Sequence, residues 1–242
     1  MQIVCPNKAL NAWVKALPTT FFSSGKVIYD ARNQIRVIEG PDGQLYVVKR
    51  YHQPAFFNRI AYTFFRTPKA VRAYRNAQIL LERGIDTPQP VAYLMCGDKL
   101  INESYLVTYK APQSAMLYEW GDGVTQGREE TMRAFGRFTA NMHEAGILHL
   151  DYSPGNILYD NNNQFTVVDI NRLRLGKVSL STGCANLHRL WGGKAMYRLI
   201  AEGYAQVRNA DVEQCFQRMF DAHHRYWQHR KLPHTDLQLV ME

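Results

Sequence analysis

Residues 143–174 read HEAGILHLDYSPGNILYDNNNQFTVVDINRLR, and this stretch decides the fold. Within it, His149 and Asp151 are separated by one residue, and Asn156 follows five positions after the aspartate. A further acid, Asp169, stands thirteen residues after Asn156. Two carboxylates and an amide at these intervals are candidates for metal and phosphate chemistry, because carboxylate and amide oxygens are ligands for Mg²⁺.

The segment between Asn156 and Asp169 predicts a β-hairpin. A short strand is expected over Ile157–Tyr159 and a second over Phe165–Ile170, with an Asn-rich turn at Asn161–Asn163 between them. Because the two strands of a hairpin run antiparallel, Asn156 and Asp169 would meet at its open end.

Phosphoryl transfer needs few protein groups: a carboxylate to accept the proton of the attacking hydroxyl, and oxygens to hold magnesium against the phosphates. Asp151 would lie one short loop from the hairpin, on the side of the acceptor. Asn171, two residues after Asp169, is expected to adopt left-handed backbone, since asparagine tolerates that conformation and a sharp turn is needed there.

A strand lysine upstream completes the pattern. Lys49 ends the otherwise apolar run Leu45-Tyr46-Val47-Val48, about a hundred residues before the loop. A lysine in this position is typical of the residue that pairs with the phosphates of a nucleotide.

The rest of the chain predicts an α+β protein of two lobes. Before Ala111-Pro112 the pattern is mostly strands around a helix that starts after Thr67-Pro68, and beyond it the pattern is mostly helical. Strands are expected at Lys26–Tyr29, Gln34–Glu39, Gln44–Tyr51, Val91–Cys96 and Ser104–Tyr109, and helices at Ala55–Arg66, Lys69–Leu81, Arg128–Ala145, Leu187–Arg208 and Asp211–Arg230. The boundary gives an N-lobe of residues 1–110 and a C-lobe of residues 111–242.

Composition and charge fit a folded protein that binds anions. The chain has 242 residues, of which 46% are hydrophobic and 21% charged, so an extended disordered chain is excluded. No apolar run is long enough to span a membrane, and no signal peptide is evident, so we expect a cytoplasmic protein. The net charge is +8, and residues 43–81 contain no acid. A basic field of this kind attracts phosphates.

The motifs together resemble those of the protein-kinase-like superfamily. More narrowly, the chain resembles the Kdo/WaaP-type lipopolysaccharide kinases, which are relatives of the RIO and aminoglycoside kinases. The resemblance covers about residues 25–174, and its motifs are Tyr46–Lys49, Leu80–Pro90, His143–Ile147, His149–Asn156 and Val168–Arg172.

This resemblance implies a bilobal protein-kinase-like fold, with a small antiparallel-sheet N-lobe and a mostly helical C-lobe. It implies that Asp151 is the catalytic base, that Asn156 and Asp169 bind magnesium, and that Lys49 contacts the α- and β-phosphates of ATP. The backbone of Tyr109, Lys110 and Ala111 would meet adenine. Supporting roles fall to His149, Ser153 and Asn171.

Three departures separate the chain from regulated protein kinases. No glycine-rich loop precedes Lys49, since the corresponding turn at residues 29–34 has no glycine. Position 153, often lysine in protein kinases, is Ser153, which favours a small-molecule acceptor. The helix Lys69–Leu81 contains no acid that could orient Lys49, so a catalytically weak pseudokinase that binds nucleotide is an alternative.

The expected acceptor is a sugar hydroxyl of a lipopolysaccharide core or a related glycan. The alternatives are a RIO-like or other small-molecule kinase, and a non-catalytic nucleotide-binding module; we do not expect a nucleic acid as partner. The Phe-rich helix Ala55–Arg66 has two interpretations. It packs on the N-lobe, or it contacts an anionic membrane peripherally at the inner face, beside a glycolipid acceptor.

Overall fold

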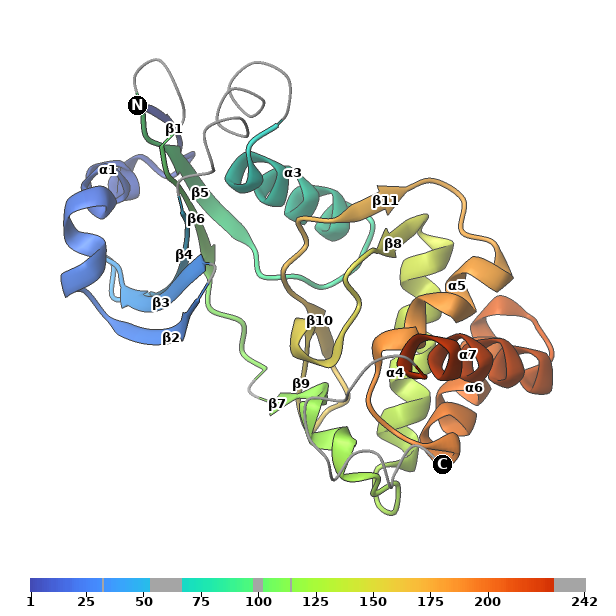
Figure 1. Cartoon of the computed structure of the whole chain (residues 1–242). Helices are drawn as coiled ribbons and strands as arrows, with labels where there is room; N and C mark the ends of the chain where they lie inside the picture. The colour runs from blue at the N-terminus through green and yellow to red at the C-terminus, as the bar shows by residue number, and fades with distance from the viewer. Residues whose placement is uncertain (32, 53–66, 98–101, 114, 229–242) are drawn as a thin grey trace. The chain divides into compact units, whose positions relative to one another are not determined.

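The structure is a computed structural model that describes residues 1–31, 33–52, 67–97, 102–113 and 115–228 (Figure 1). The chain divides into two units, and each is described by itself. The small unit contains residues 1–82 and 87–112, and the large unit contains residues 83–86 and 113–242. The predicted helix Ala55–Arg66 lies outside the described residues.

An antiparallel sheet forms the small unit, with the strand order β1-β5-β6-β4-β3-β2. All five strands predicted here are confirmed, with ends that shift by about one residue. Their bounds are β2 Lys26–Asp30, β3 Asn33–Glu39, β4 Leu45–Tyr51, β5 Pro90–Met95 and β6 Ser104–Tyr109; β1 covers Gln2–Val4.

One face of this sheet is covered by α1 (Asn11–Thr20), an element to which the sequence analysis assigned no structure. Leu10, Val14 and Leu17 recur at helical spacing, are fully buried and pack against the sheet. Pro18 lies inside the helix and obscured its pattern, because proline usually ends a helix.

The opposite face of the sheet carries α3 (Lys69–Glu82), as Figure 1 shows. Tyr74 of this helix packs edge-on against Tyr93 of β5, with 5.3 Å between the ring centroids. Tyr51 and Leu106 belong to the same buried cluster. The sheet is therefore sandwiched between helices over part of its surface.

In the large unit, α4 (Glu129–Glu144) and α6 (Lys194–Arg208) pack closely. Gly136 and Gly203 permit this approach. A Cβ at Gly136 would lie 2.2 Å from the carbonyl oxygen of Ile200, and one at Gly203 would lie 1.9 Å from that of Arg133. The two backbones touch where a side chain has no room.

The single helix predicted over Leu187–Arg208 is wrong. The structure has α5 (Leu180–Asn186), a 3₁₀ turn and then α6, with Leu190 extended at φ −65° and ψ 155°. Gly192 and Gly193 follow, and a pair of glycines weakens helix formation. The last described helix, α7 (Val212–Trp227), begins after Asp211, whose side chain accepts a hydrogen bond from the amide of Gln214.

Short strands complete the large unit. They form two small sheets, one with the order β10-β9-β7 and one pairing β11 with β8. The bounds are β7 Ala115–Met116, β8 Ile147–His149, β9 Ile157–Tyr159, β10 Phe165–Val167 and β11 Leu173–Leu175. None of the helices in the described part of the chain combines the length and apolarity that crossing a bilayer requires.

Candidate active site

The loop that follows β8 is organised around a buried histidine. The amide N–H of Asp151 donates to Nδ1 of His149 over 3.1 Å, which fixes that nitrogen as an acceptor. Nε2 therefore carries the proton and donates to the carbonyl oxygen of Val168, also at 3.1 Å. Burial lowers the pKa of His149, which agrees with a neutral ring. His149 thus ties the start of the loop to the strand that precedes Asp169.

Asn186, at the end of α5, holds the same loop from the other side. Its Nδ2 donates to the carbonyl oxygen of His149 over 3.0 Å, and its Oδ1 lies 3.2 Å from Nε2 of His143. Sequence reasoning missed this residue. An asparagine thirty-seven positions from its partner leaves no local signal in one sequence.

Asp151 is paired with an arginine that the sequence analysis also missed. Nη1 of Arg189 donates to Oδ1 of Asp151, and each side chain is 32% exposed. The guanidinium of Arg189 lies over the ring of Tyr226 in α7, 5.6 Å from the ring centroid. The carboxylate is therefore oriented by a cation that is itself braced by an aromatic ring.

The predicted hairpin between Asn156 and Asp169 is confirmed. β9 and β10 pair antiparallel with Ile157 opposite Val167, and the amide of Val168 donates to the carbonyl oxygen of Asn156 over 2.9 Å. The register places Asn156 and Asp169 at the open end of the hairpin. Nδ2 of Asn156 donates to the carbonyl oxygen of Asp151 over 2.9 Å, so Oδ1 is the atom that Asn156 can offer to a cation.

The sharp turn expected after the hairpin is located two residues earlier than predicted. Asp169 itself adopts the left-handed conformation, with φ 51°, whereas Asn171 does not. The prediction for the backbone of Asn171 is therefore wrong. Its side chain is nevertheless engaged, because Nδ2 donates to Oδ1 of Asp169 over 3.1 Å. A non-glycine residue in this conformation stores strain, which is typical of functional sites.

Ser153 belongs to the backbone frame of the loop. Its amide donates to the carbonyl oxygen of Asp151 over 3.0 Å, and its carbonyl oxygen accepts from the amide of Asn156 over 2.9 Å. Tyr152, which lies between Asp151 and Ser153, is buried and hydrogen-bonded to Thr139 of α4 at 2.9 Å. The loop is thus anchored to the helical core between Asp151 and Asn156.

The donor set at the open end of the hairpin fits a magnesium ion. Mg²⁺ in phosphoryl-transfer sites is held by one or two protein oxygens together with substrate phosphates and water. Asn156 and Asp169 supply one amide and one carboxylate oxygen. Among the described residues there is no group of three or more His, Cys, Asp or Glu that could hold a metal ion.

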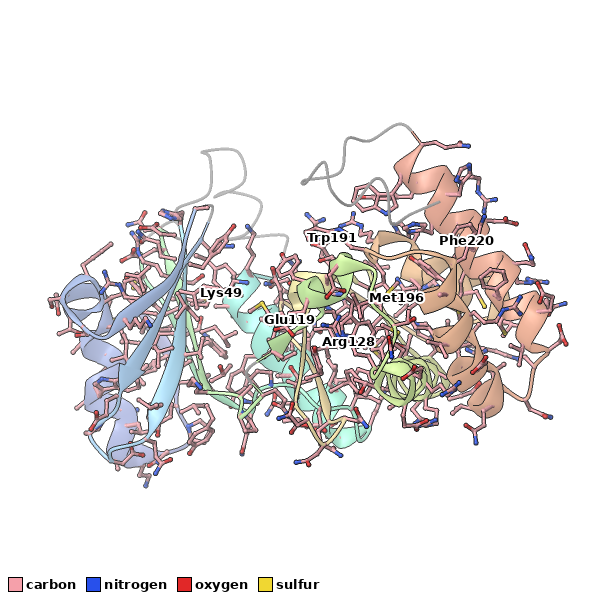
Figure 2. The ribbon with its side chains drawn as sticks, turned by 90° about the horizontal axis from the view of Figure 1, so that it is seen from below. Lys49, Glu119, Arg128, Trp191, Met196 and Phe220 are labelled. Atoms are coloured by element: carbon pink, nitrogen blue, oxygen red, sulfur yellow. The ribbon has the colours of Figure 1, made fainter. Side chains whose placement is uncertain are left out.

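In the small unit, Lys49 lies on the sheet face opposite α1. Side chains alternate along a strand, so Lys49 shares its face with Val47 and Tyr51, and its Nζ lies 5.3 Å from the centroid of the Tyr51 ring. Lys49 pairs with Ile35 of β3 on one side and Leu106 of β6 on the other. Figure 2 shows Lys49 projecting from this sheet.

The segment from Tyr109 to Ala111 follows the end of β6. The amide of Tyr109 donates to the carbonyl oxygen of Gln89, and that of Lys110 donates to the carbonyl oxygen of Leu45, both over 3.0 Å. The Tyr109 ring packs on Tyr46, 5.2 Å away, within the core formed with α1. The side chain of Tyr109 thus faces away from the Lys49 side of the sheet.

An antiparallel sheet with a strand lysine and a helical unit with this Asp, Asn and Asp arrangement define a protein-kinase-like phosphotransferase. Residues 33–217 match the model of the lipopolysaccharide kinase (Kdo/WaaP) family, and the chain belongs to this family. The protein is therefore a kinase.

A solved structure supports the fold. The chain is similar to "WaaP in complex with acyl carrier protein", with a TM-score of 0.62 and 18% identity. The match covers 94% of this chain and 100% of that chain. No curated protein matches the chain. The predicted bilobal kinase-like fold, the family and the class of enzyme are thus confirmed.

Proposed function

We propose that the protein transfers the γ-phosphoryl group of ATP, with magnesium, to a sugar hydroxyl of a lipopolysaccharide core or a related glycan. The observation that carries the proposal is the convergence of Asp151, Asn156 and Asp169 in one loop and hairpin of the large unit. Family membership supports a sugar acceptor, and Ser153, in place of the lysine common in protein kinases, agrees with a small molecule.

Asp151 is assigned as the general base. The oxygen of the sugar hydroxyl attacks the γ-phosphorus, the bond from that phosphorus to the β-γ bridging oxygen breaks, and ADP leaves. The hydroxyl proton passes to the Asp151 carboxylate. Arg189 contacts one oxygen of this carboxylate and limits its rotation, which leaves the other oxygen to meet the acceptor.

Asn156 and Asp169 are assigned to magnesium, which when bound neutralises charge on the phosphates. Asn171 fixes the Asp169 carboxylate by donating to it. We assign Lys49 to the α- and β-phosphates, and the backbone of Tyr109, Lys110 and Ala111 to adenine. The packing of the Tyr109 ring on Tyr46, against the core formed with α1, supports a role for its backbone rather than its side chain.

The test uses γ-labelled ATP, magnesium and purified lipopolysaccharide core as acceptor. Asp151→Asn and Asp169→Asn should each lower the transfer rate at least about a hundredfold. The matched control is Asp160→Asn, in the turn of the same hairpin. The Asp160 side chain accepts hydrogen bonds from the backbone amides of Asn162 and Gln164. Amide oxygens can accept those bonds as well, so this variant should retain activity.

The outcomes also separate the alternatives. Nucleotide binding without transfer to any acceptor by the wild type identifies a pseudokinase, for which the absence of an acid from residues 69–81 is the motivating observation. Transfer to another small molecule or to protein, but not to the core sugar, identifies a different kinase specificity. Equal transfer by the wild type, Asp151→Asn and Asp169→Asn would overturn the assignment of the site.

A further inference from the structure

An exposed tyrosine, Tyr118, lies directly beside residues 150–156, the loop that carries the proposed base Asp151 and is here named the catalytic loop. It belongs to the 3₁₀ helix η3 (Leu117–Asp122), in which residues three apart share a face. Leu117 and Trp120 form the inner face and are buried, whereas Tyr118 is 47% exposed. Trp120 packs edge-on against Phe135 of α4 at 5.5 Å, so the turn that carries Tyr118 is anchored in the core.

The side chain of the neighbouring Glu119 adds a second anchor. Its Oε2 accepts a hydrogen bond from the hydroxyl of Tyr159 in β9 over 3.0 Å. Nη1 of Arg128 lies 2.9 Å from Oδ1 of Asp122, at the end of the same turn. Tyr118 is thus held out of the core by a fixed turn, and its exposure does not reflect a loose segment.

The ring of Tyr118 touches the backbone of the catalytic loop at Gly155. A Cβ placed on Gly155 would lie 2.1 Å from the Tyr118 hydroxyl and 2.5 Å from Cζ, so a larger residue would require the phenol to move away from the loop. Gly155 has no positive φ, and its need for glycine is therefore one of space. The residue immediately before Asn156 is kept bare so that an aromatic ring can lie against it.

A second segment runs beside the same loop, from Arg189 to Trp191. Leu190 is extended and 2% exposed, so its two neighbours project to the opposite side. Arg189 contacts Asp151, and Trp191 packs against Tyr118 with 4.8 Å between ring centroids and 41° between ring planes. Arg189 thus contacts one end of the loop directly, and Trp191 packs on the tyrosine that lies against Gly155 near the other end.

We propose that Tyr118 and Trp191 form a stacking subsite for a sugar ring of the acceptor, a proposal that rests on the proposed function. One face of a pyranose ring exposes C–H bonds, whose partial positive charge and apolar surface suit the negative face of an aromatic ring. Sites for small ligands combine such apolar walls with a few polar groups. Here the polar groups are Asp151 and Arg189.

The comparison with a buried aromatic pair of the same unit supports a ligand role. Trp120 and Phe135 are both buried and serve packing. Tyr118 contributes little burial to the core, yet a glycine in the catalytic loop is kept free for it. Figure 2 shows Trp191 apart from Phe220, which comes from α7 and offers a matched aromatic control in the same unit.

The experiment measures transfer from ATP to a deacylated lipopolysaccharide core oligosaccharide. At saturating ATP, Tyr118→Ala and Trp191→Ala should raise the KM for the oligosaccharide at least about tenfold, in line with the loss of an aromatic contact. The kcat and the KM for ATP should stay within about twofold, because neither ring is assigned to the nucleotide. Trp191→Phe keeps an aromatic face and should stay within about threefold of the wild type.

Phe220→Ala should leave the KM for the oligosaccharide unchanged, which separates loss of an aromatic ring in general from loss of this pair. An unchanged KM for the oligosaccharide in both Tyr118→Ala and Trp191→Ala, with Asp151→Asn still inactive, would overturn the proposed subsite but not the proposed function. Equal increases of the KM for ATP and for the oligosaccharide would also overturn it, since they would show distortion of the loop. If the wild type transfers no phosphate to the oligosaccharide, the proposed acceptor and the subsite fall together.

Discussion

The catalytic loop of the large unit and the β2–β3 hairpin of the small unit are built in opposite ways. The loop is hydrogen-bonded to several elements: Asn186 of α5 binds the carbonyl oxygen of His149, and the amide of Leu150 donates to the carbonyl oxygen of Arg172 over 2.8 Å. All five residues of β2 are exposed, and β2 is the last strand of its sheet, paired with β3 alone.

The contrast shows where the site needs rigid geometry. Groups that act on a reacting atom must be held to a fraction of an ångström, and the loop with Asp151 and Asn156 is held by hydrogen bonds that are buried or partly buried. An exposed edge hairpin has few buried contacts and belongs to the part of a protein that opens at low free-energy cost. Asp30 and Asn33, on either side of the position where kinases carry glycines, belong to this hairpin.

The largest expected effect is a loss of stability of the large unit at acid pH. Burial lowers the pKa of His143 and of His223 to about 4, below the value of about 6.5 expected in an unfolded chain. The unfolded state therefore binds more protons between these values, and the stability present above pH 6.5 is lost as the pH falls towards 4. At pH 5 each histidine should cost about 2 kcal/mol relative to pH 7.

Urea unfolding followed by tryptophan fluorescence at pH 7 and pH 5 measures this effect. Trp120 is buried in the large unit and provides a reporter there. The variant His143→Gln removes one titrating group, so its stability should fall by about 2 kcal/mol less between the two pH values than that of the wild type. Equal stability of the wild type at both pH values would contradict the prediction.

A smaller effect is expected when the brace on the candidate base is removed. Arg189→Ala should lower the transfer rate about tenfold, because the Asp151 carboxylate loses the contact that orients it. Arg189→Lys keeps the charge but loses the planar guanidinium over Tyr226, and its transfer rate should lie between those of the wild type and Arg189→Ala. The KM for ATP serves as the control and should not change. A rate equal to that of the wild type in Arg189→Ala would show that the loop alone orients Asp151.

The same contrast explains what could be predicted from the sequence. The hairpin from Asn156 to Asp169 was predictable because its strands and turn are adjacent in the chain. Arg189 and Asn186 were not, because their contacts with the loop are made across thirty-eight and thirty-seven residues by helices whose packing the pattern does not specify. The left-handed residue was assigned to Asn171 on intrinsic preference, whereas the structure has that conformation at Asp169. Intrinsic preference could not separate the two positions, because Asp and Asn both tolerate it.

The same reasoning applies to the fold. Strands β2 to β6 of the small unit and helix α4 follow from alternation and helical spacing, whereas β1 was not predicted. Helix α1 was missed because Pro18 interrupts a short pattern, and the break inside the predicted helix Leu187–Arg208 was missed because Leu190 is buried in an extended conformation. A buried leucine supports a helix pattern equally well, so periodicity alone could not locate this break.

The smallest expected effect is that of Ile28→Thr, and the same substitution at a buried isoleucine tests the contrast. Ile28 of β2 is 53% exposed, whereas Ile157 of β9, directly after Asn156, is fully buried. Threonine keeps the β-branched shape that strands favour, so Ile28→Thr should change the free energy of unfolding by less than about 0.5 kcal/mol. Ile157→Thr removes a buried methyl group and buries a hydroxyl, and should cost at least about 2 kcal/mol.

Urea unfolding of both variants measures the difference, and hydrogen exchange of the β2 and β9 peptides in the wild type gives an independent readout. Similar costs at the two sites, or slow exchange in β2, would show that β2 is as firmly held as the catalytic loop. The division of the molecule into a rigid catalytic loop and a weakly held edge hairpin would then be wrong.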